Sequence, residues 1–361
     1  MKLPRIAVCA ALVLCFAAFA EAADAGPLKP PRGKVFFGVT DTGDAEGFRS
    51  FAESIGKHPA VIQTYHPWGN SLSQALPRWQ SVRARPILHI STADGDGREV
   101  VTPRGIALGK GDDYLLRINR NFARRKLRAY IRPLGEPNRC LNPYAAVDCA
   151  GNARPSRYLP VWHRKAFRRM YLLLRGGRTR RAVNRELRRL GLPRLRRSGG
   201  REPRYLPRAP VALIWSPLPA GSPTTKLNRP GRFYPGDRYT DWVATDFYSR
   251  YPHWKDLKRF YTRYSKRRRK PFALTEWGVW GADDPRFVRR LFRFFDHRPR
   301  ARMLVYYQDF GSVNEFRIQN YPTSLTILAH RLRSPRFPGL APNPPTPPIR
   351  TGGVGSGARR N

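Results

Sequence analysis

The sequence predicts an α/β protein whose single large domain is a (β/α)8 barrel, also called a TIM barrel. Eight short apolar runs alternate with longer helical segments between about residues 34 and 334, and eight is the number of strands that this barrel requires. The first run ends in Gly38-Val39-Thr40-Asp41, which is not the Gly-rich phosphate-binding turn that an open doubly wound sheet usually carries there. These two observations favour the barrel over the open sheet.

The eight apolar runs are rich in Val, Ile, Leu, Phe and Tyr, and most of them lie beside Gly or Pro. Near-continuous apolarity of this kind is typical of parallel strands that are buried on both faces. We expect strands at Val35–Val39, Ala60–Tyr65, Arg85–Ile90, Leu127–Arg132, Val211–Trp215, Trp242–Phe247, Phe272–Thr275 and Met303–Tyr307.

The segments between these runs carry helical signals. Asp284 followed by Pro285 predicts an N-cap and a proline in the first helical turn. Residues 175–208 are long and very basic, and we interpret them as an insertion between the fourth and fifth strands with a helix near Val183–Leu190. One apolar helix face is predicted from Phe167, Met170, Tyr171 and Leu174.

Both ends of the chain are expected to lie outside this domain. A basic start precedes an apolar run from Ile6 to Ala20 and a stretch of small residues, which predicts a secretory signal peptide over residues 1–23. We therefore expect a secreted protein with no membrane span after the signal is removed, the alternative being an uncleaved anchor. Residues 24–33 form a Pro-rich leader, and residues 335–361 are expected to be a disordered, basic tail rich in Pro and Gly.

The formal net charge is +43, from 68 Lys and Arg against 25 Asp and Glu. Such a charge attracts polyanions, for example acidic glycans or an anionic cell envelope. The basic residues are spread along the whole chain, so compositional bias with solvated charged faces is the simpler interpretation. The sequence has no zinc-finger, RNP or helix-turn-helix signature, so nucleic acid is not an expected partner.

Cys140 and Cys149 are the two cysteines outside the predicted signal. Their separation of nine positions in an exported protein predicts a local disulfide that closes one loop. No second Cys pair or spaced His pair accompanies them, which disfavours zinc, and we expect no bound metal.

Two glutamates follow predicted strands that lie on opposite sides of the barrel. Glu136 follows the fourth strand and Glu276 ends the seventh. Functional side chains of such barrels gather where the strands end, so both carboxylates are expected in one pocket. Hydrolysis of a glycosidic bond needs such a pair, since one acid protonates the leaving oxygen and a second carboxylate lies across the anomeric carbon. A single glutamate after a strand is more often a helix N-terminal charge or an ion-pair partner, and the joint placement is what favours catalysis.

Other polar and aromatic side chains at the strand ends are candidates for substrate binding. Aromatic rings offer flat faces to sugars and histidines can bond sugar hydroxyls, although each such residue taken alone is more typical of a core or structural position. The candidates are His66, Trp68, His89, Arg132, Asn138, Trp215, Asp246, Trp277 and Tyr307.

The segments around these carboxylates resemble glycoside hydrolase family 26, the β-mannanase family of the large retaining (β/α)8 clan. The segment from Arg132 to Asn138 is similar to the family's Arg-Pro-x-His-Glu-x-Asn. The stretch from Tyr234 to Tyr248 resembles the family's strand-six signature, and the one from Thr275 to Gly278 resembles its nucleophile strand. The resemblance extends from about Val35 to Leu332.

This resemblance implies roles for three residues. Glu136 would be the acid/base, Glu276 the nucleophile that forms the glycosyl-enzyme, and Tyr248 the partner that orients Glu276. It implies an endo-β-1,4-mannanase-like, retaining cleavage of a β-linked polysaccharide, with carboxyl groups about 5–5.5 Å apart and no cofactor. Because two close carboxylates cannot both ionise freely, Glu136 is expected to have the raised pKa.

The chain departs from the family pattern in two places. Gly135 stands where the family has a histidine, beside the subsite that holds the sugar under attack, so the exact polysaccharide stays open. Tyr307 stands where related barrels often place a tryptophan platform. The alternative function is a catalytically weak or inactive barrel that binds polysaccharide or an anionic envelope. The sequence leaves the linkage and the endo or exo mode open, and we expect a monomer.

Overall fold

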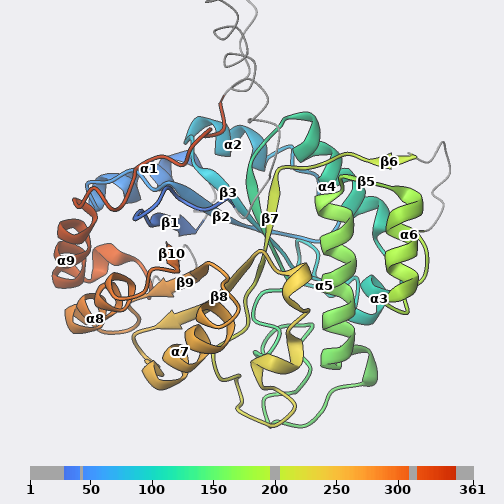
Figure 1. Ribbon diagram of the computed structural model, residues 1–361. Coiled ribbons are helices and arrows are strands. Elements are labelled where there is room, and N and C mark those ends of the chain that lie inside the picture. Colours follow the sequence, from blue (N-terminus) through green and yellow to red (C-terminus); the bar gives the residue numbers. More distant parts are fainter. Residues whose placement is uncertain (1–27, 41–43, 196–203, 309–314, 347–361) are drawn as a thin grey trace, which may run out of the picture.

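A computed structural model describes residues 28–40, 44–195, 204–308 and 315–346, and it confirms the (β/α)8 barrel (Figure 1). Eight parallel strands close in the order β1-β10-β9-β8-β7-β4-β3-β2. All eight predicted strands are present, and β9, the seventh of them, extends three residues beyond its predicted end. They are β1 (Phe36–Thr40), β2 (Val61–His66), β3 (Arg85–Ile90), β4 (Ala129–Pro133), β7 (Val211–Trp215), β8 (Trp242–Tyr248), β9 (Phe272–Gly278) and β10 (Ala301–Tyr306).

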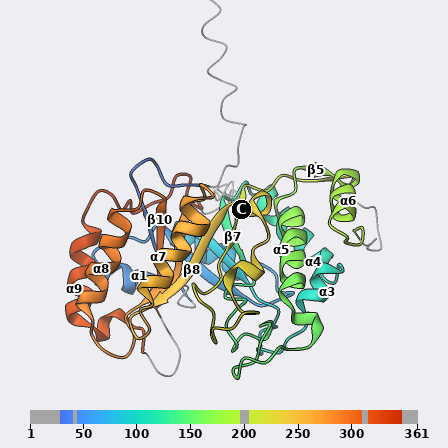
Figure 2. The same cartoon turned by 60° about the horizontal axis from the view of Figure 1, so that its bottom comes forward.

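Helices surround the strands, with α1, α8 and α9 on one side of the barrel and α3, α4 and α5 on the other (Figure 2). The α8 helix begins as predicted, because the Asp284 side chain accepts a hydrogen bond from the Phe287 amide and Pro285 is the first helical residue. The helices are α1 (Ala45–Ser54), α2 (Ala75–Ser81), α3 (Pro103–Ala107), α4 (Asp112–Arg124), α5 (Pro160–Arg175), α6 (Arg180–Arg189), α7 (Trp254–Phe260), α8 (Pro285–Asp296) and α9 (Pro322–Leu332). Shorter helical turns are η1 (Ser156–Tyr158), η2 (Pro230–Phe233), η3 (Asp237–Tyr239), η4 (Tyr261–Lys266) and η5 (Ile318–Asn320).

The barrel interior has an apolar layer with a polar layer above it. Side chains of a strand alternate between its two faces, so the residues two positions after the apolar layer also point inward, at the C-terminal ends of the strands. There the inward residues are polar, and they include Gln63, Arg132, Asp246 and Thr275. The apolar layer comprises Phe36, Val61, Ile87, Tyr130, Ala212, Ile214, Trp242, Ala244, Ala273, Met303 and Val305.

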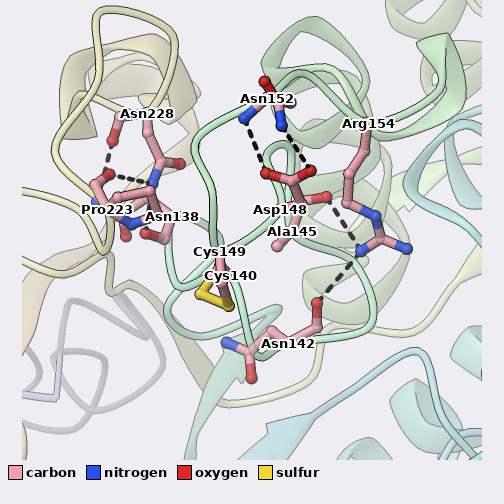
Figure 3. Close-up of a disulfide and its surroundings, with 10 residues drawn as sticks. All are labelled: Asn138, Cys140, Asn142, Ala145, Asp148, Cys149, Asn152, Arg154, Pro223 and Asn228. Carbon is pink, nitrogen blue, oxygen red and sulfur yellow. Dashed lines mark hydrogen bonds between the residues drawn. A yellow bond between two sulfur atoms is a disulfide. The ribbon is translucent and has the colours of Figure 1, made fainter.

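The predicted disulfide between Cys140 and Cys149 is present in the loop that follows β4 (Figure 3). Hydrogen bonds hold the rest of this loop: the Asp148 carboxylate accepts from the backbone and side chain of Asn152, and Arg154 donates to carbonyls of the loop. Cys140 lies four residues after Glu136, so the cross-link stabilises the backbone next to one of the predicted catalytic residues.

The basic insertion contains the predicted helix, which is α6. It also contains a short antiparallel pair that the sequence did not predict, β5 (Arg178–Thr179) and β6 (Tyr205–Leu206). Two-residue strands carry too little periodicity to be recognised from sequence, because alternation needs about four residues to become visible.

The prediction of a disordered tail was wrong for residues 335–346, because these residues pack against the barrel. Phe337 is buried, and the carbonyl of Pro342 accepts a hydrogen bond from the buried guanidinium of Arg85. The high Pro and Gly content of the segment hid two buried apolar side chains, Phe337 and Ala341, of which Ala341 packs with the apolar layer of the barrel interior. Residues 347–361 lie outside the described part of the chain.

The predicted signal peptide, residues 1–23, also lies outside the described part of the chain. Among the residues that the structure does describe, none of the helices combines the length and apolarity needed to cross a bilayer.

Candidate active site

Three acidic side chains meet at the C-terminal mouth of the barrel. Asp246 lies in β8, Glu276 lies in β9, and Glu136 follows the end of β4. One carboxylate oxygen of each lies within 4.8 Å of the corresponding oxygens of the other two. The two glutamates that the sequence placed in one pocket therefore do lie together. Both retain contact with solvent, because Glu136 is 8% exposed and Glu276 is 7% exposed.

An irregularity in β9 directs Glu276 into the barrel. Thr245 of β8 lies opposite Leu274, but the next residue of β8, Asp246, lies opposite Glu276, so Thr275 is an extra residue on β9. Thr275 still faces the interior, where its hydroxyl donates to Asp246 at 2.8 Å. The bulge thus places two consecutive side chains on the inner face. Bulges are common beside active sites because they change the direction of one side chain.

Arg132 at the end of β4 holds two of the carboxylates. Its guanidinium is fully buried and donates to Glu276 and to Asp246. Burial alone would raise the pKa of Glu276, but the charge and hydrogen bond of Arg132 outweigh burial and lower this pKa. Burial raises the pKa of Asp246 well above its usual range against the opposing charge of Arg132. Arg132 therefore supplies a positive charge between these two carboxylates.

Tyrosines surround Glu276 on its open side. The hydroxyl of Tyr248 donates to Glu276 at 2.8 Å, which is the contact that the sequence predicted. Tyr65 of β2 is 40% exposed, and its ring makes edge contacts with the rings of His89 and Tyr307, at 5.3 and 6.3 Å between centroids. The half-buried Tyr307 also contacts Tyr248. These rings form an aromatic rim beside the nucleophile position.

Glu136 lies in a strained turn. Its φ is 49°, and Leu134 has the same value. Left-handed backbone is unfavourable for residues other than glycine, and such strain gathers at functional sites. Burial first, and the charge of Glu276 second, raise the pKa of Glu136, while Arg139 opposes them with its Nη1 atom 3.3 Å from the carboxylate. The two glutamates therefore have pKa values shifted in opposite directions, as an acid and a nucleophile require.

Gly135, where the family has histidine, leaves no room for a side chain. A Cβ atom would lie 2.6 Å from Nε of Arg132 and 2.8 Å from Nε2 of His89. The Gly135 amide donates to Nε2 of His89 at 3.1 Å, and the Tyr144 hydroxyl donates to the Gly135 carbonyl. Burial, with a contribution from Arg132, lowers the pKa of His89 to about 3, so this ring is a neutral acceptor. The imidazole of His89, from β3, thus lies beside the space that a side chain at position 135 would need.

Two tryptophans predicted to bind substrate lie in the hydrophobic core. Trp277 is fully buried and packs against Phe292 and Tyr306, while Trp215 packs against Phe260 and other rings outside the barrel. Strand alternation is the reason, because each follows or precedes an inward residue and so points outward. Neither offers a face to a sugar, and the structure does not support their assignment to the site.

Three further substrate-binding candidates lie in packed positions away from the catalytic carboxylates. Trp68 packs on Tyr114, His66 stacks on the same ring, and Asn138 is fully buried among backbone groups of the β4 and β7 loops. The pKa of His66 is lowered by burial. The structure therefore groups His89, Arg132, Asp246 and Tyr307 with the catalytic candidates and separates the other five from them.

The sequence analysis missed four residues that contact the site. Two of them, Gln63 and Tyr65, occupy inward positions on β2, and their alternation with the apolar Val61 could have identified them. Tyr144 lies in the loop closed by the disulfide and Arg139 immediately precedes it, and no periodic signal exists in this segment.

An eight-stranded parallel barrel with two facing glutamates at its C-terminal mouth belongs to the class of (β/α)8 barrels with a paired-carboxylate site. Within that class, solved structures of family 26 glycoside hydrolases have the same fold. A GH26 β-mannanase from Bacteroides ovatus, BoMan26A, is 17% identical with a TM-score of 0.56 over 86% of this chain and 92% of that one. GH26A from a Muricauda species is 15% identical with a TM-score of 0.54 over 88% and 97% of the two chains.

A third structure is the catalytic domain of the GH26 endo-β-1,4-mannanase from Bacillus sp. JAMB-750. It is 13% identical with a TM-score of 0.53, over 83% of this chain and 86% of that one. No protein-family model matches the chain, and no curated protein matches it. The expected likeness to the family 26 fold is confirmed, and at these identities the likeness concerns the fold alone.

Proposed function

We propose that the protein is a glycoside hydrolase that cleaves a β-linked polysaccharide with retention of configuration. The observation that carries this proposal is the approach of Glu136 and Glu276, whose nearest carboxylate oxygens lie within 4.8 Å at one mouth of the barrel. A retaining pair is about 5–5.5 Å apart, whereas an inverting pair needs roughly 6.5–9.5 Å to admit a water molecule. The shared fold with family 26 structures supports the same assignment.

In the first step, an oxygen of Glu276 attacks the anomeric carbon while Glu136 transfers its proton to the departing glycosidic oxygen. The bond from carbon to that oxygen breaks, and its electron pair leaves with the protonated alcohol. Arg132 and Tyr248 hold Glu276 in place through hydrogen bonds, so its orientation does not depend on the substrate. Glu276 and the sugar are then joined by an ester.

In the second step, water attacks the same carbon and restores the free carboxylate of Glu276. Formation of the ester removes the negative charge that had raised the pKa of Glu136. The pKa of Glu136 therefore falls in the intermediate, and Arg139 favours its ionised form. An ionised Glu136 can accept the proton of the attacking water, which converts it from acid to base.

For the substrate, we propose a β-mannan-like polysaccharide in contact with the aromatic rim. Tyr65 and Tyr307 offer partly exposed rings next to the nucleophile, which suits the apolar faces of sugar rings. Gly135 stands where the family has a histidine, so the screen below includes glycans other than mannan. Secretion is part of this proposal, and it rests on the signal-like N-terminus.

The test is a screen of the protein against β-mannans, β-glucans and β-xylans, with proton NMR of the first products released. We expect the β-anomer at early times from the best substrate, and Glu136→Ala and Glu276→Ala each to lower kcat by at least about 10³-fold. Glu53→Ala, at an exposed position of α1, is the matched control.

Azide separates the two roles. In Glu276→Ala, azide attacks from the side of the missing nucleophile and forms the α-glycosyl azide. In Glu136→Ala, azide attacks the glycosyl-enzyme and forms the β-glycosyl azide. Binding of polysaccharide by the unaltered protein without release of any sugar would instead support the inactive, carbohydrate-binding barrel.

A further inference from the structure

The basic insertion after α5 is firmly attached to the barrel. Gly177 donates to the Leu206 carbonyl, which begins the β5–β6 pair. At Gly176, whose φ is 61°, a Cβ atom would lie 2.1 Å from the Pro207 carbonyl, so the two segments touch through backbone. The amide of Asn119, which is buried in α4, donates to the same Pro207 carbonyl at 3.0 Å. The base of the insertion is thus packed against the helical layer.

The α6 helix is also fixed. Val183 and Leu187 are buried in the main core. The buried Arg169 of α5 donates to Asp112 of α4 and to the carbonyl of Pro193, which follows α6. The described residues on either side of α6 are therefore held to the barrel by buried contacts.

Two hollows flank the β5–β6 pair. The larger, of about 680 Å³, is lined by Thr179, Asn184 and five arginines, Arg180, Arg181, Arg188, Arg194 and Arg204. The smaller, of about 230 Å³, is lined by Arg178, Arg208 and Tyr205, which is 50% exposed, and by Arg175, which is paired with Asp241. Arg178 lines one hollow and Thr179 the other, as expected for consecutive strand residues. No carboxylate belongs to the lining of either hollow within the described residues.

The arrangement on α6 concentrates positive charge on one side. Arg181, Asn184 and Arg188 are spaced i, i+3, i+7, so they share one helix face. The acidic residue of this helix, Glu186, points elsewhere and bonds Arg189 and Tyr239. Like charges held at this spacing repel one another, and an anion placed among them relieves that repulsion.

These hollows are distant from the catalytic candidates. The α5 helix begins after the loop that follows Glu136 and runs 16 residues to Arg175, where the insertion starts. At 1.5 Å per residue its length is roughly 24 Å. Figure 1 places β5, β6 and α6, and Figure 2 places β5 and α6, beside the end of α5 where the insertion starts. A ligand in the hollows would lie at the opposite end of the barrel from Glu136 and Glu276.

We propose that the two hollows form a second binding site that takes an acidic polysaccharide through its carboxylate groups. Guanidinium groups bind carboxylates with paired hydrogen bonds, and the exposed ring of Tyr205 offers a face to a sugar ring of the same polymer. The choice of a glycan rests on the proposed function, since an enzyme of this kind works on polysaccharide mixtures. Such a site would hold the enzyme on an acidic polysaccharide while Glu136 and Glu276 cleave a second, neutral polysaccharide.

The test measures binding of sodium polygalacturonate to the full-length protein carrying Glu276→Gln, which cannot consume a polymer by the proposed mechanism. The test variant adds Arg181→Gln, Arg188→Gln and Arg204→Gln, all at exposed positions. Loss of three exposed ion pairs is expected to weaken the affinity about tenfold. The affinity for neutral galactomannan, which is expected to bind at the C-terminal mouth of the barrel, should be the same in the parent and in the test variant.

The control variant removes the same charge elsewhere, through Arg286→Gln, Arg289→Gln and Arg293→Gln on the exposed face of α8. We expect its affinity for polygalacturonate to change less than about twofold. Equal losses in the two variants would mean a diffuse effect of net charge and would overturn the proposal, as would absence of binding in the parent. Tighter binding of polyphosphate than of polygalacturonate would overturn the choice of carboxylate.

Failure of the second binding site can be distinguished from failure of the proposed hydrolase activity. If the unaltered protein releases no sugar from any polysaccharide, hydrolysis fails. A selective loss of polygalacturonate binding in the hollow variant would still establish the second site.

Discussion

At Glu136, two neighbouring charges act on one pKa in opposite directions. Glu276 raises it and Arg139 lowers it, in addition to the effect of burial. A general acid works only while it is protonated, so activity should fall as pH rises through this pKa. Arg139→Met removes the charge that lowers the pKa. We therefore expect the alkaline limb of the kcat/KM profile to move to higher pH, measured on the best substrate of the screen.

Arg286→Met removes a charge of the same sign from the exposed side of α8 and serves as the control. Its profile should coincide with that of the unaltered protein. If the alkaline limb of Arg139→Met moved to lower pH, or moved equally in the control, Glu136 would not be the acid.

Gly135 allows a second prediction for a single residue. A methyl group at this position meets Arg132 and His89 at distances shorter than real contacts. Arg132 is held by Glu276 and Asp246, and His89 accepts a hydrogen bond from the Gly135 amide itself. We expect Gly135→Ala to lower the free energy of unfolding by about 1–3 kcal/mol, as overpacking does, and to reduce kcat because Arg132 must shift. Urea unfolding and kinetics measure the two effects. Gly95→Ala has open space around its new methyl group and should change neither.

At the scale of the element, strand alternation explains which site residues the sequence could identify. The strand ends and the two glutamates follow from local apolar runs and from the residues after them. The direction of the residues around Glu276 depends on a bulge, and a bulge arises from pairing with β8, which lies far away in sequence. Trp277 was therefore predicted to bind substrate, although its side chain points into the core. The inward alternation of β2 would have identified Tyr65, which was overlooked.

This difference between Trp277 and Tyr65 is measurable. Trp277→Leu removes a fully buried ring, so we expect a loss of roughly 2–4 kcal/mol in unfolding free energy with KM nearly unchanged. Tyr65→Ala removes a ring that is 40% exposed at the rim, so we expect a higher KM and a much smaller loss of stability. A large increase in KM for Trp277→Leu with unchanged stability would show that Trp277 contacts the substrate.

At the scale of the whole molecule, the sequence predicted the barrel because each of its eight strands has a local signature that needs no partner to be recognised. The disulfide followed in the same way from two cysteines and their spacing. Features made by distant segments were not predictable, such as the β5–β6 pair and the contact of residues 335–346 with the barrel. Hydrogen bonds to backbone carbonyls stabilise these features. Because every residue has a backbone carbonyl, no sequence pattern identifies the ones that are used.

The closure of the barrel's N-terminal end leads to a prediction about the domain boundary. The buried Arg85 donates to carbonyls of Leu28 and Pro342, so segments from both ends of the domain meet on one guanidinium. Truncation after Ser334 removes the Pro342 carbonyl and buried Phe337, which should cost about 3–5 kcal/mol and lower Tm by several degrees. Truncation after residue 346 keeps every described contact and is the control. Equal Tm values for the two truncated proteins would show that the domain ends at residue 334.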